Sequence, residues 1–180
     1  MNLTAIREPE QIVERHFGES FFLARKLDVS GALKIGSRPG AQPKVVDIGS
    51  GAGFPGIPLK IARPNITLTL VEAQQRKAVF LREVMRALNL DGQVKNVRAE
   101  DLVQMESESA DVVTLRAVEK FEAILPTAAR IVAPAGHLAV LIGIGQVESA
   151  QKTLEGWSFA PLFPIPGSKS RVILLANQNG

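Results

Sequence analysis

The sequence contains no cysteine and no long apolar run, and both absences narrow what the protein can be. Without cysteine the chain cannot use a thiol nucleophile, bind zinc through thiolates or form a disulfide. Its apolar stretches, such as residues 138–144, fall far short of the roughly 20 residues that a membrane-spanning helix needs. The chain also starts without the charged-then-apolar pattern of a secretory signal. We therefore expect a soluble, cytoplasmic protein.

Common catalytic and nucleotide-binding patterns are missing as well. No Gly-Lys-Ser/Thr follows the glycine-rich stretch of the chain, which excludes a Walker A loop. His16 and His137 are the only histidines, and no Ser/His/Asp or Cys/His arrangement can be assembled around them. We expect His137, which lies in a strand pattern, to serve packing or the surface. No metal site is predicted.

The composition of the chain is that of an ordinary globular protein, but its charges are unevenly distributed. Of its 180 residues, 46% are hydrophobic and 22% are charged, which suits one domain with a full core. The net charge is +3, but residues 1–90 hold 13 basic and 8 acidic side chains while residues 91–180 hold 8 and 10. Such a field can orient a polyanion toward one face, although ordinary solvated side chains explain it equally well.

Helix and strand patterns alternate along most of the chain. Residues 9–30 carry apolar positions at helical spacing, and residues 36–43 read as a linker. Strand patterns then follow at 45–48, 66–71, 93–98, 110–115 and 136–142, and helical patterns at 55–62, 74–88, 119–132 and 147–154. Two further strands, 157–163 and 171–175, are joined by a turn at 164–167. This order predicts an α/β fold with a Rossmann-like, mostly parallel, doubly wound sheet and a C-terminal antiparallel hairpin. We expect an N-terminal helical segment and linker (1–43) and a main domain (44–180).

The glycine-rich loop after the first strand is the most informative segment. Gly49, Gly51 and Gly53 are spaced G-x-G-x-G, whereas the dinucleotide fingerprint is G-x-G-x-x-G. Side chains at these positions would block a ligand or forbid the backbone angles of the turn. Asp47, two residues earlier, is expected to face a cationic group, and the following helix to direct N–H groups at a negative one. This combination suits the zwitterionic methionine of S-adenosylmethionine better than a pyrophosphate.

Acidic residues after the next two strands complete the predicted nucleoside site. Glu72 ends the second strand roughly 20 residues past the loop, where a carboxylate binds ribose hydroxyls. Ala99 and Glu100 follow the third strand, where the chain passes over the adenine. Asp47 and Glu72 could instead merely cap loops, and Glu100 could be the N-cap of a short helix. The whole arrangement favours a nucleoside-type cofactor.

Three motifs give the chain a specific resemblance. The start (residues 2–9), with Arg15-His16-Phe17 and Ser20, resembles the N-terminal helical segment of the RsmG (GidB) family. Residues 47–58, with their Gly-Phe-Pro-Gly-Ile-Pro tail, resemble the cofactor loop of that family. Leu115-Arg116-Ala117-Val118 is similar to its arginine motif. The resemblance covers nearly the whole chain.

The resemblance implies methylation of guanine N7 in the decoding region of 16S ribosomal RNA, with S-adenosylmethionine as cofactor and the RNA or the 30S subunit as partner. It implies that Gly49 and Phe54 line the cofactor loop, that Ala99 and Glu100 flank the adenine, and that Arg116 lies near cofactor and target base as the catalytic candidate. Guanine N7 has a free lone pair and no proton to remove. The reaction therefore needs the base held close to the methyl group and the charge stabilised, and it needs no general base.

Basic and histidine side chains are candidates for contact with the RNA. His16 lies in a matched motif, and Arg76 and Lys77 begin a helix whose basic face, continued by Arg82 and Arg86, could bind phosphates. A solvated helix face is an equally good interpretation of these residues. Arg116 could likewise form a structural salt bridge with Glu119 or Glu122.

One departure from the family pattern keeps other functions open. The family tends to place a lysine after the fifth strand, in a Leu-Lys-Gly context, where this chain has Leu141-Ile142-Gly143. A methyltransferase of another RNA or of a small molecule, and a non-catalytic ribosome-assembly relative, are therefore alternatives. An NAD-dependent oxidoreductase is disfavoured by the glycine spacing.

Overall fold

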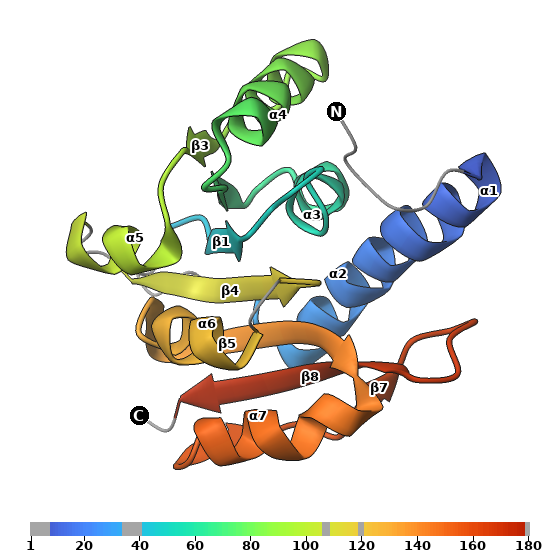
Figure 1. The fold of residues 1–180 in the computed structure, drawn as a ribbon, viewed down its shortest axis with the longest axis vertical. Coiled ribbons are helices and arrows are strands. Elements are labelled where there is room, and N and C mark those ends of the chain that lie inside the picture. The colour runs from blue at the N-terminus through green and yellow to red at the C-terminus, as the bar shows by residue number, and fades with distance from the viewer. Residues whose placement is uncertain (1–7, 34–40, 106–108, 119–120, 179–180) are drawn as a thin grey trace.

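The computed structural model describes residues 8–33, 41–105, 109–118 and 121–178 (Figure 1). The N-terminal segment forms α1 (Pro9–Ile12), the π-helix η1 (Val13–Gly18) and α2 (Glu19–Ser30). The other helices are α3 (Gly56–Ala62), α4 (Gln75–Ala87), α5 (Ala99–Met105), α6 (Phe121–Ala129), the 3-10 turn η2 (Ile144–Gln146) and α7 (Val147–Thr153). The strands are β1 (Lys44–Ile48), β2 (Thr67–Val71), β3 (Gln93–Lys95), β4 (Ala110–Arg116), β5 (Val132–Gly143), β6 (Trp157–Phe159), β7 (Phe163–Pro164) and β8 (Arg171–Gln178).

These strands form one sheet in the order β3-β2-β1-β4-β5-β8-β6, with β7 also paired to β8. Strands β1 to β5 pair in parallel, whereas β8 runs antiparallel to β5 and to β6. The predicted doubly wound sheet with a C-terminal antiparallel hairpin is therefore confirmed. In the sheet, β2 lies on one side of β1 and β4 lies on the other, so the strand order changes direction at β1. The carboxyl ends of β1 and β4 thus meet at the switch point, where doubly wound sheets bind ligands.

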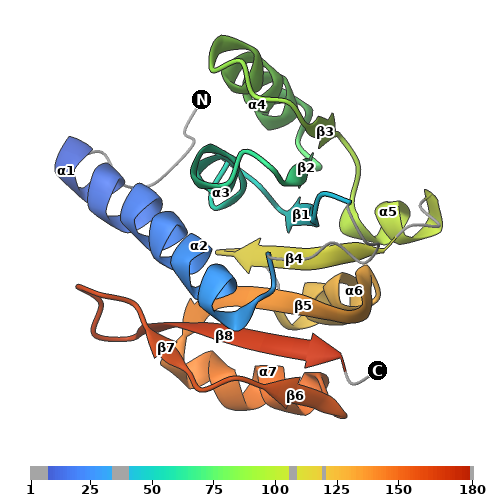
Figure 2. The ribbon, with the colours of Figure 1, turned by 180° about the vertical axis from the view of Figure 1, so that it is seen from behind.

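Successive side chains of each central strand point to opposite faces of the sheet, and both faces are buried. Val46 and Ile48 point to a core shared with α5, α6 and α7, while Val45 points to a second core shared with α2, α3 and α4. Figure 1 shows α6 and α7 in front of the sheet, and Figure 2, from behind, shows α2 in front of it. Burial on both faces explains the near-continuous apolar runs of the central strands. It also leaves the edge formed by the strand ends as the place for polar chemistry.

The apolar spacing of helix α4 predicts its buried face only in part. The pattern puts Val79, Phe80, Val84 and Leu88 on that face, and Phe80 and Val84 do pack against the core, but Val79 and Leu88 are 48% and 50% exposed. Ala78, Leu81 and Met85 are buried instead. Both stripes have helical spacing, so contact with the sheet, which the pattern does not contain, decides between them.

Other boundaries also shift. The fifth strand begins at Val132 rather than at residue 136, and the strand predicted at 157–163 breaks into β6 and β7. The helix predicted at 119–132 is too long at its C-terminal end, since α6 ends at Ala129 and β5 begins at Val132. Residues 119–120 at its start lie outside the described part, as do residues 36–40 of the linker. Within the described ranges, no helix is long and apolar enough to cross a membrane.

Candidate cofactor and substrate site

The loop after β1 needs its glycines for backbone geometry. Gly49, Gly51 and Gly53 all have positive φ, at +68°, +56° and +94°. A Cβ atom on Gly49 would lie 2.4 Å from the Val118 side chain, and one on Gly53 would lie 2.4 Å from Ile57. At Gly51 the one atom of the described residues within 4 Å of such a Cβ is the Gly49 carbonyl oxygen at 3.8 Å, so a side chain there would project into open space. A side chain at residue 51 would occupy this open space, which we call the Gly51 cradle.

The N–H groups of this loop are used within the protein. Gly49 and Ser50 donate to the Val71 carbonyl at 2.9 and 3.1 Å, and Gly53 and Phe54 donate to the Ser50 carbonyl at 2.7 and 3.2 Å. The Gly51 N–H donates to the Glu72 carboxylate at 2.9 Å, and the Gly56 N–H, at the start of α3, donates to the Asp47 carboxylate at 3.2 Å. The prediction that the start of the helix directs N–H groups at a negative ligand group is wrong for these residues. A loop built in this way has few donors for a pyrophosphate.

Asp47 is fully buried and holds the strand ends together. Its Oδ1 accepts a hydrogen bond from the Thr114 hydroxyl at 2.7 Å, and its Oδ2 accepts one from the Gly56 N–H at 3.2 Å. Burial raises the pKa of Asp47 to about 6, against the effect of these hydrogen bonds, which favour the ionised form. No part of the carboxylate is open to a ligand in this structure. The geometry therefore supports an indirect role, in which Asp47 fixes β1, β4 and the start of α3 relative to one another.

Glu72 holds the cofactor loop from the end of β2. Its Oε2 accepts from the Gly51 N–H at 2.9 Å and its Oε1 from the Gln74 N–H at 2.8 Å. Asn96, which the sequence analysis missed, donates to the carbonyls of Glu72 and Ala73 at 2.8 and 2.9 Å. Each carboxylate oxygen of Glu72 keeps a second lone pair that can accept from a hydroxyl. The side chain thus lies beside Gly51, and its contact with a ribose stays a prediction.

Ala99 and Glu100 begin helix α5, so the short helix is present, but Glu100 lies in its first turn and is not its N-cap. Ala99 is buried and Glu100 is exposed. Their contact with an adenine is not tested by the structure and stays a prediction.

The predicted Phe54 packs against the N-terminal helical segment. Its ring stacks on His16 with the centroids 5.0 Å apart and meets Phe17 edge-on at 4.9 Å. His16 is buried, and its pKa falls to about 4 because of burial and the nearby positive charges of Arg116, Arg15 and Arg171. The structure therefore joins the cofactor loop to η1 through three aromatic rings and keeps His16 neutral at pH 7.

Arg116, at the carboxyl end of β4, is bound by the same segment. Its guanidinium pairs with Glu19 at 3.2 Å, donates to the Arg15 carbonyl at 3.1 Å and lies 2.8 Å from His16 Nδ1. Since arginine only donates, Nδ1 is an acceptor and the ring proton lies on Nε2. Glu19 also pairs with Arg171 at the start of β8. A buried carboxylate thus links two strands to the N-terminal helix.

This arrangement agrees with a structural role of Arg116 but not with the partners predicted for it. Glu119 lies outside the described residues, and Glu122 accepts a hydrogen bond from Ser149 at 2.8 Å. The actual partner, Glu19, is 97 residues away in the chain, and only three-dimensional contact reveals it. Direct contact of Arg116 with cofactor or base is untested.

The end of β4 has an unusual backbone that places Val118 over the loop. Ala117 has φ +49°, a left-handed conformation that non-glycine residues rarely adopt and that often marks functional sites. This turn brings the Val118 side chain against Gly49. The chain that leaves β4 therefore lies directly beside the predicted cofactor loop.

The predicted basic face on α4 is only partly available for RNA. Arg82 donates to the Val94 carbonyl at 3.2 Å, and Arg86 pairs with Glu83 at 2.9 Å. Arg76 is exposed and Lys77 is half-buried at the start of the helix, beside the carboxyl end of β2. These two remain the basic candidates nearest the predicted site.

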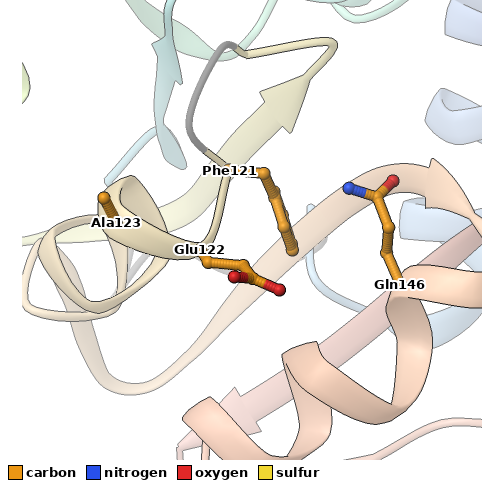
Figure 3. Close-up of a pocket in the computed structure, with 4 residues that line it drawn as sticks. All are labelled: Phe121, Glu122, Ala123 and Gln146. Carbon is orange, nitrogen blue, oxygen red and sulfur yellow. The ribbon is translucent and has the colours of Figure 1, made fainter.

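A hollow of about 410 Å³ opens between α6 and η2 (Figure 3). Phe121, Glu122 and Ala123 line one side and Gln146 lines the other. These residues follow β4 and β5, two paired parallel strands, so the hollow is on the same edge of the sheet as the glycine loop. Sequence patterns gave no sign of it, because its walls come from separate segments. Among the described residues, no three His, Asp or Glu side chains gather as a metal site.

Comparison with known proteins places the chain in a family. The family model described as rRNA small subunit methyltransferase G matches residues 1–163. The chain belongs to this family. A ribosomal RNA small subunit methyltransferase G from Caldanaerobacter subterraneus is 41% identical over 160 residues, which cover 86% of this chain and 63% of that protein. One from Xanthomonas axonopodis is 34% identical over 182 residues, covering 99% of this chain and 79% of that protein. The RsmG (GidB) resemblance and membership of a methyltransferase family are confirmed.

Solved structures of methyltransferases share the fold at low sequence identity. Magnesium protoporphyrin IX methyltransferase from Synechocystis, determined with bound SAH, has a TM-score of 0.69 at 16% identity and covers 98% of this chain, with 90% of its own chain matched. TYW2 from Pyrococcus horikoshii, in complex with MeSAdo, has a TM-score of 0.67 at 14% identity over 96% of this chain and 64% of its own. These likenesses confirm the Rossmann-like methyltransferase fold.

The departure at residue 142 also has a structural explanation. Ile142 is 5% exposed and belongs to the core beneath α6 and α7, paired in register with Val172 of β8. An apolar side chain suits this position. The substitution leaves the loop after β1 untouched.

Proposed function

We propose that this protein transfers a methyl group from S-adenosylmethionine to N7 of a guanine in 16S ribosomal RNA. The observation that carries the proposal is the cradle at Gly51, beside which the Glu72 carboxylate accepts a hydrogen bond from the Gly51 N–H. The N–H groups of Gly49, Ser50, Gly51, Gly53 and Phe54 are used within the protein, which leaves few donors for a pyrophosphate, and the Glu72 carboxylate can accept from sugar hydroxyls. The scarcity of donors favours a nucleoside over a dinucleotide. Family membership supports the ribosomal RNA substrate.

The residues present fit this cofactor. Gly51 leaves space for it, Glu72 provides acceptors for its ribose, and Ala99 and Glu100 start the helix that follows the next strand. The bound cofactor supplies an electrophilic methyl group on a sulfonium. Asp47 and Glu72 keep the loop in shape, while Arg116, Glu19 and His16 fix the rim opposite it.

The chemistry demands positioning rather than acid or base catalysis. The N7 lone pair forms a bond to the methyl carbon as the carbon–sulfur bond breaks, and the electron pair of that bond stays on sulfur. The positive charge moves from sulfur to the guanine ring, and no proton is transferred. A rigid site that holds the base in line therefore suffices. This agrees with a neutral His16, which has no proton to accept in the reaction.

Predictions of the domain division, the localisation and the partner are part of the proposal. We treat residues 1–43 as an N-terminal helical segment and linker and residues 44–180 as the methyltransferase domain, and the contacts of His16 and Glu19 support an association of the two. We place the protein in the cytoplasm, where ribosomal RNA is processed, with 16S RNA or the 30S subunit as its partner.

The experiment that tests this function is methyl transfer to 30S subunits that lack the modification. The protein is incubated with labelled S-adenosylmethionine and the subunits, and the RNA is then digested to nucleosides. We expect label in 7-methylguanosine, and none when subunits already carrying the modification are used. Label in another nucleoside, or no label in the RNA, would contradict the proposal.

A further inference from the structure

The hollow between α6 and η2 lies one strand beyond the glycine loop. The loop follows β1, Phe121 follows β4, and Gln146 follows β5, and these three strands are neighbours in the sheet. Val118, between β4 and Phe121, touches Gly49 of the loop. A group bound in the hollow therefore lies next to whatever occupies the cradle. Its volume, about 410 Å³, falls in the range of ligand pockets, roughly 300–1,000 Å³.

The polar groups of the hollow have defined orientations. Gln146 Oε1 accepts a hydrogen bond from the Gly143 N–H at 3.1 Å. Since only the amide oxygen can accept, the amide nitrogen must point away from Gly143. Figure 3 shows that nitrogen directed toward Phe121. Gln146 therefore presents two N–H donors to the hollow.

The opposite wall presents an acceptor and an aromatic ring. Glu122 Oε1 accepts from the Ser149 hydroxyl at 2.8 Å, which holds the carboxylate in place and leaves further lone pairs on both oxygens. Phe121 is 8% exposed, and in Figure 3 its ring stands between Glu122 and Gln146. The exposed part of this ring gives the hollow an apolar wall against which a base can pack.

We propose that this hollow binds the target base and reads it as guanine. Guanine has two donors, N1–H and the N2 amino group, beside one acceptor, O6. The Glu122 carboxylate accepts from the two donors, the Gln146 amide donates to O6, and the base packs against Phe121. N7 takes part in none of these contacts and stays free for methylation. Adenine and cytosine present an acceptor where Glu122 needs a donor. The proposal rests on the proposed function and adds the residues that choose the base.

The test compares guanosine with inosine, which lacks only the N2 amino group. Reconstituted 30S subunits carry one or the other at the methylated position, and initial rates are measured for the wild-type chain and the Glu122→Gln variant. A lost hydrogen bond to a charged group weakens recognition roughly tenfold or more. We expect wild type to prefer guanosine by that factor and Glu122→Gln to lose the preference. Glu155→Gln, an exposed change outside the hollow, is the matched control and should keep it.

A second variant tests the other wall. Gln146→Glu keeps an oxygen for the Gly143 N–H but replaces the donor that faces O6, so we expect a slower rate on guanosine with unchanged binding of S-adenosylhomocysteine. Binding of that compound also shows that each variant is folded. A wild type that methylates guanosine and inosine equally, or a Glu122→Gln variant that keeps the preference, would overturn the base-reading site while the proposed function stands. No methylation of guanosine subunits by wild type would overturn both.

Discussion

His16 illustrates how one side chain responds to its surroundings. Burial and three arginines lower its pKa from 6.5 to about 4, so the folded protein does not bind a proton that the unfolded chain binds between these pH values. The free energy of unfolding therefore falls as the pH drops through this window. We expect the His16 contribution to fall by about 2 kcal/mol between pH 7 and pH 5.

The measurement is urea unfolding of wild type and His16→Gln at both pH values. The raised pKa of Asp47 has the opposite effect, since the folded protein then binds the extra proton and stability rises as the pH falls from about 6. Asp47 is present in both proteins, so the difference between them isolates His16. An identical pH dependence of the two would contradict the neutral, buried ring.

At the scale of elements, one buried carboxylate adds to the apolar contacts that hold the N-terminal helix on the sheet. Glu19 is 4% exposed at its side chain and pairs with Arg116 and Arg171. Removing its charge leaves two guanidinium groups without their anion. We expect Glu19→Gln to lower the free energy of unfolding by about 3–5 kcal/mol. Glu10→Gln, an exposed change on α1, should have little effect, and equal stability of the two variants would show that the ion pairs do not hold the helix.

The sequence predicted the elements better than their contacts. The short apolar runs of the sequence predicted the bounds of β1, β2 and β4 closely, because strands buried on both faces are apolar at nearly every position. The position of Glu72 was predicted from its place at the end of a strand. The partners of Arg116 and the internal use of the loop N–H groups were not, since both depend on contacts between distant segments. The face that α4 buries was predicted only in part, at Phe80 and Val84, for the same reason.

At the scale of the whole molecule, charge should govern binding to RNA. The excess of basic residues lies in the half of the chain that forms α1 to α4. If Arg76 and Lys77 each contact a phosphate, the double variant Arg76→Gln/Lys77→Gln should weaken binding to 30S subunits. It should also reduce the slope of log affinity against log salt by about 2. Filter binding across salt concentrations measures this slope.

The matched control changes two exposed basic residues elsewhere. Arg130 follows α6 at the opposite edge of the sheet, and Lys152 lies on α7. Arg130→Gln/Lys152→Gln removes the same net charge and should leave the slope nearly unchanged. Equal slopes for the two double variants would mean that α4 does not contact the RNA.

The central claim, that the loop after β1 seats a nucleoside cofactor, is tested most directly by calorimetric titration with S-adenosylhomocysteine. Wild type is compared with Gly51→Val, which fills the cradle, and with Gly31→Val. Gly31 also has positive φ (+84°) and open surroundings, but it ends α2, so it carries the same backbone strain outside the site. We expect binding by wild type and Gly31→Val and none by Gly51→Val. Undiminished affinity in Gly51→Val, or binding of NAD in place of S-adenosylhomocysteine by wild type, would contradict the account.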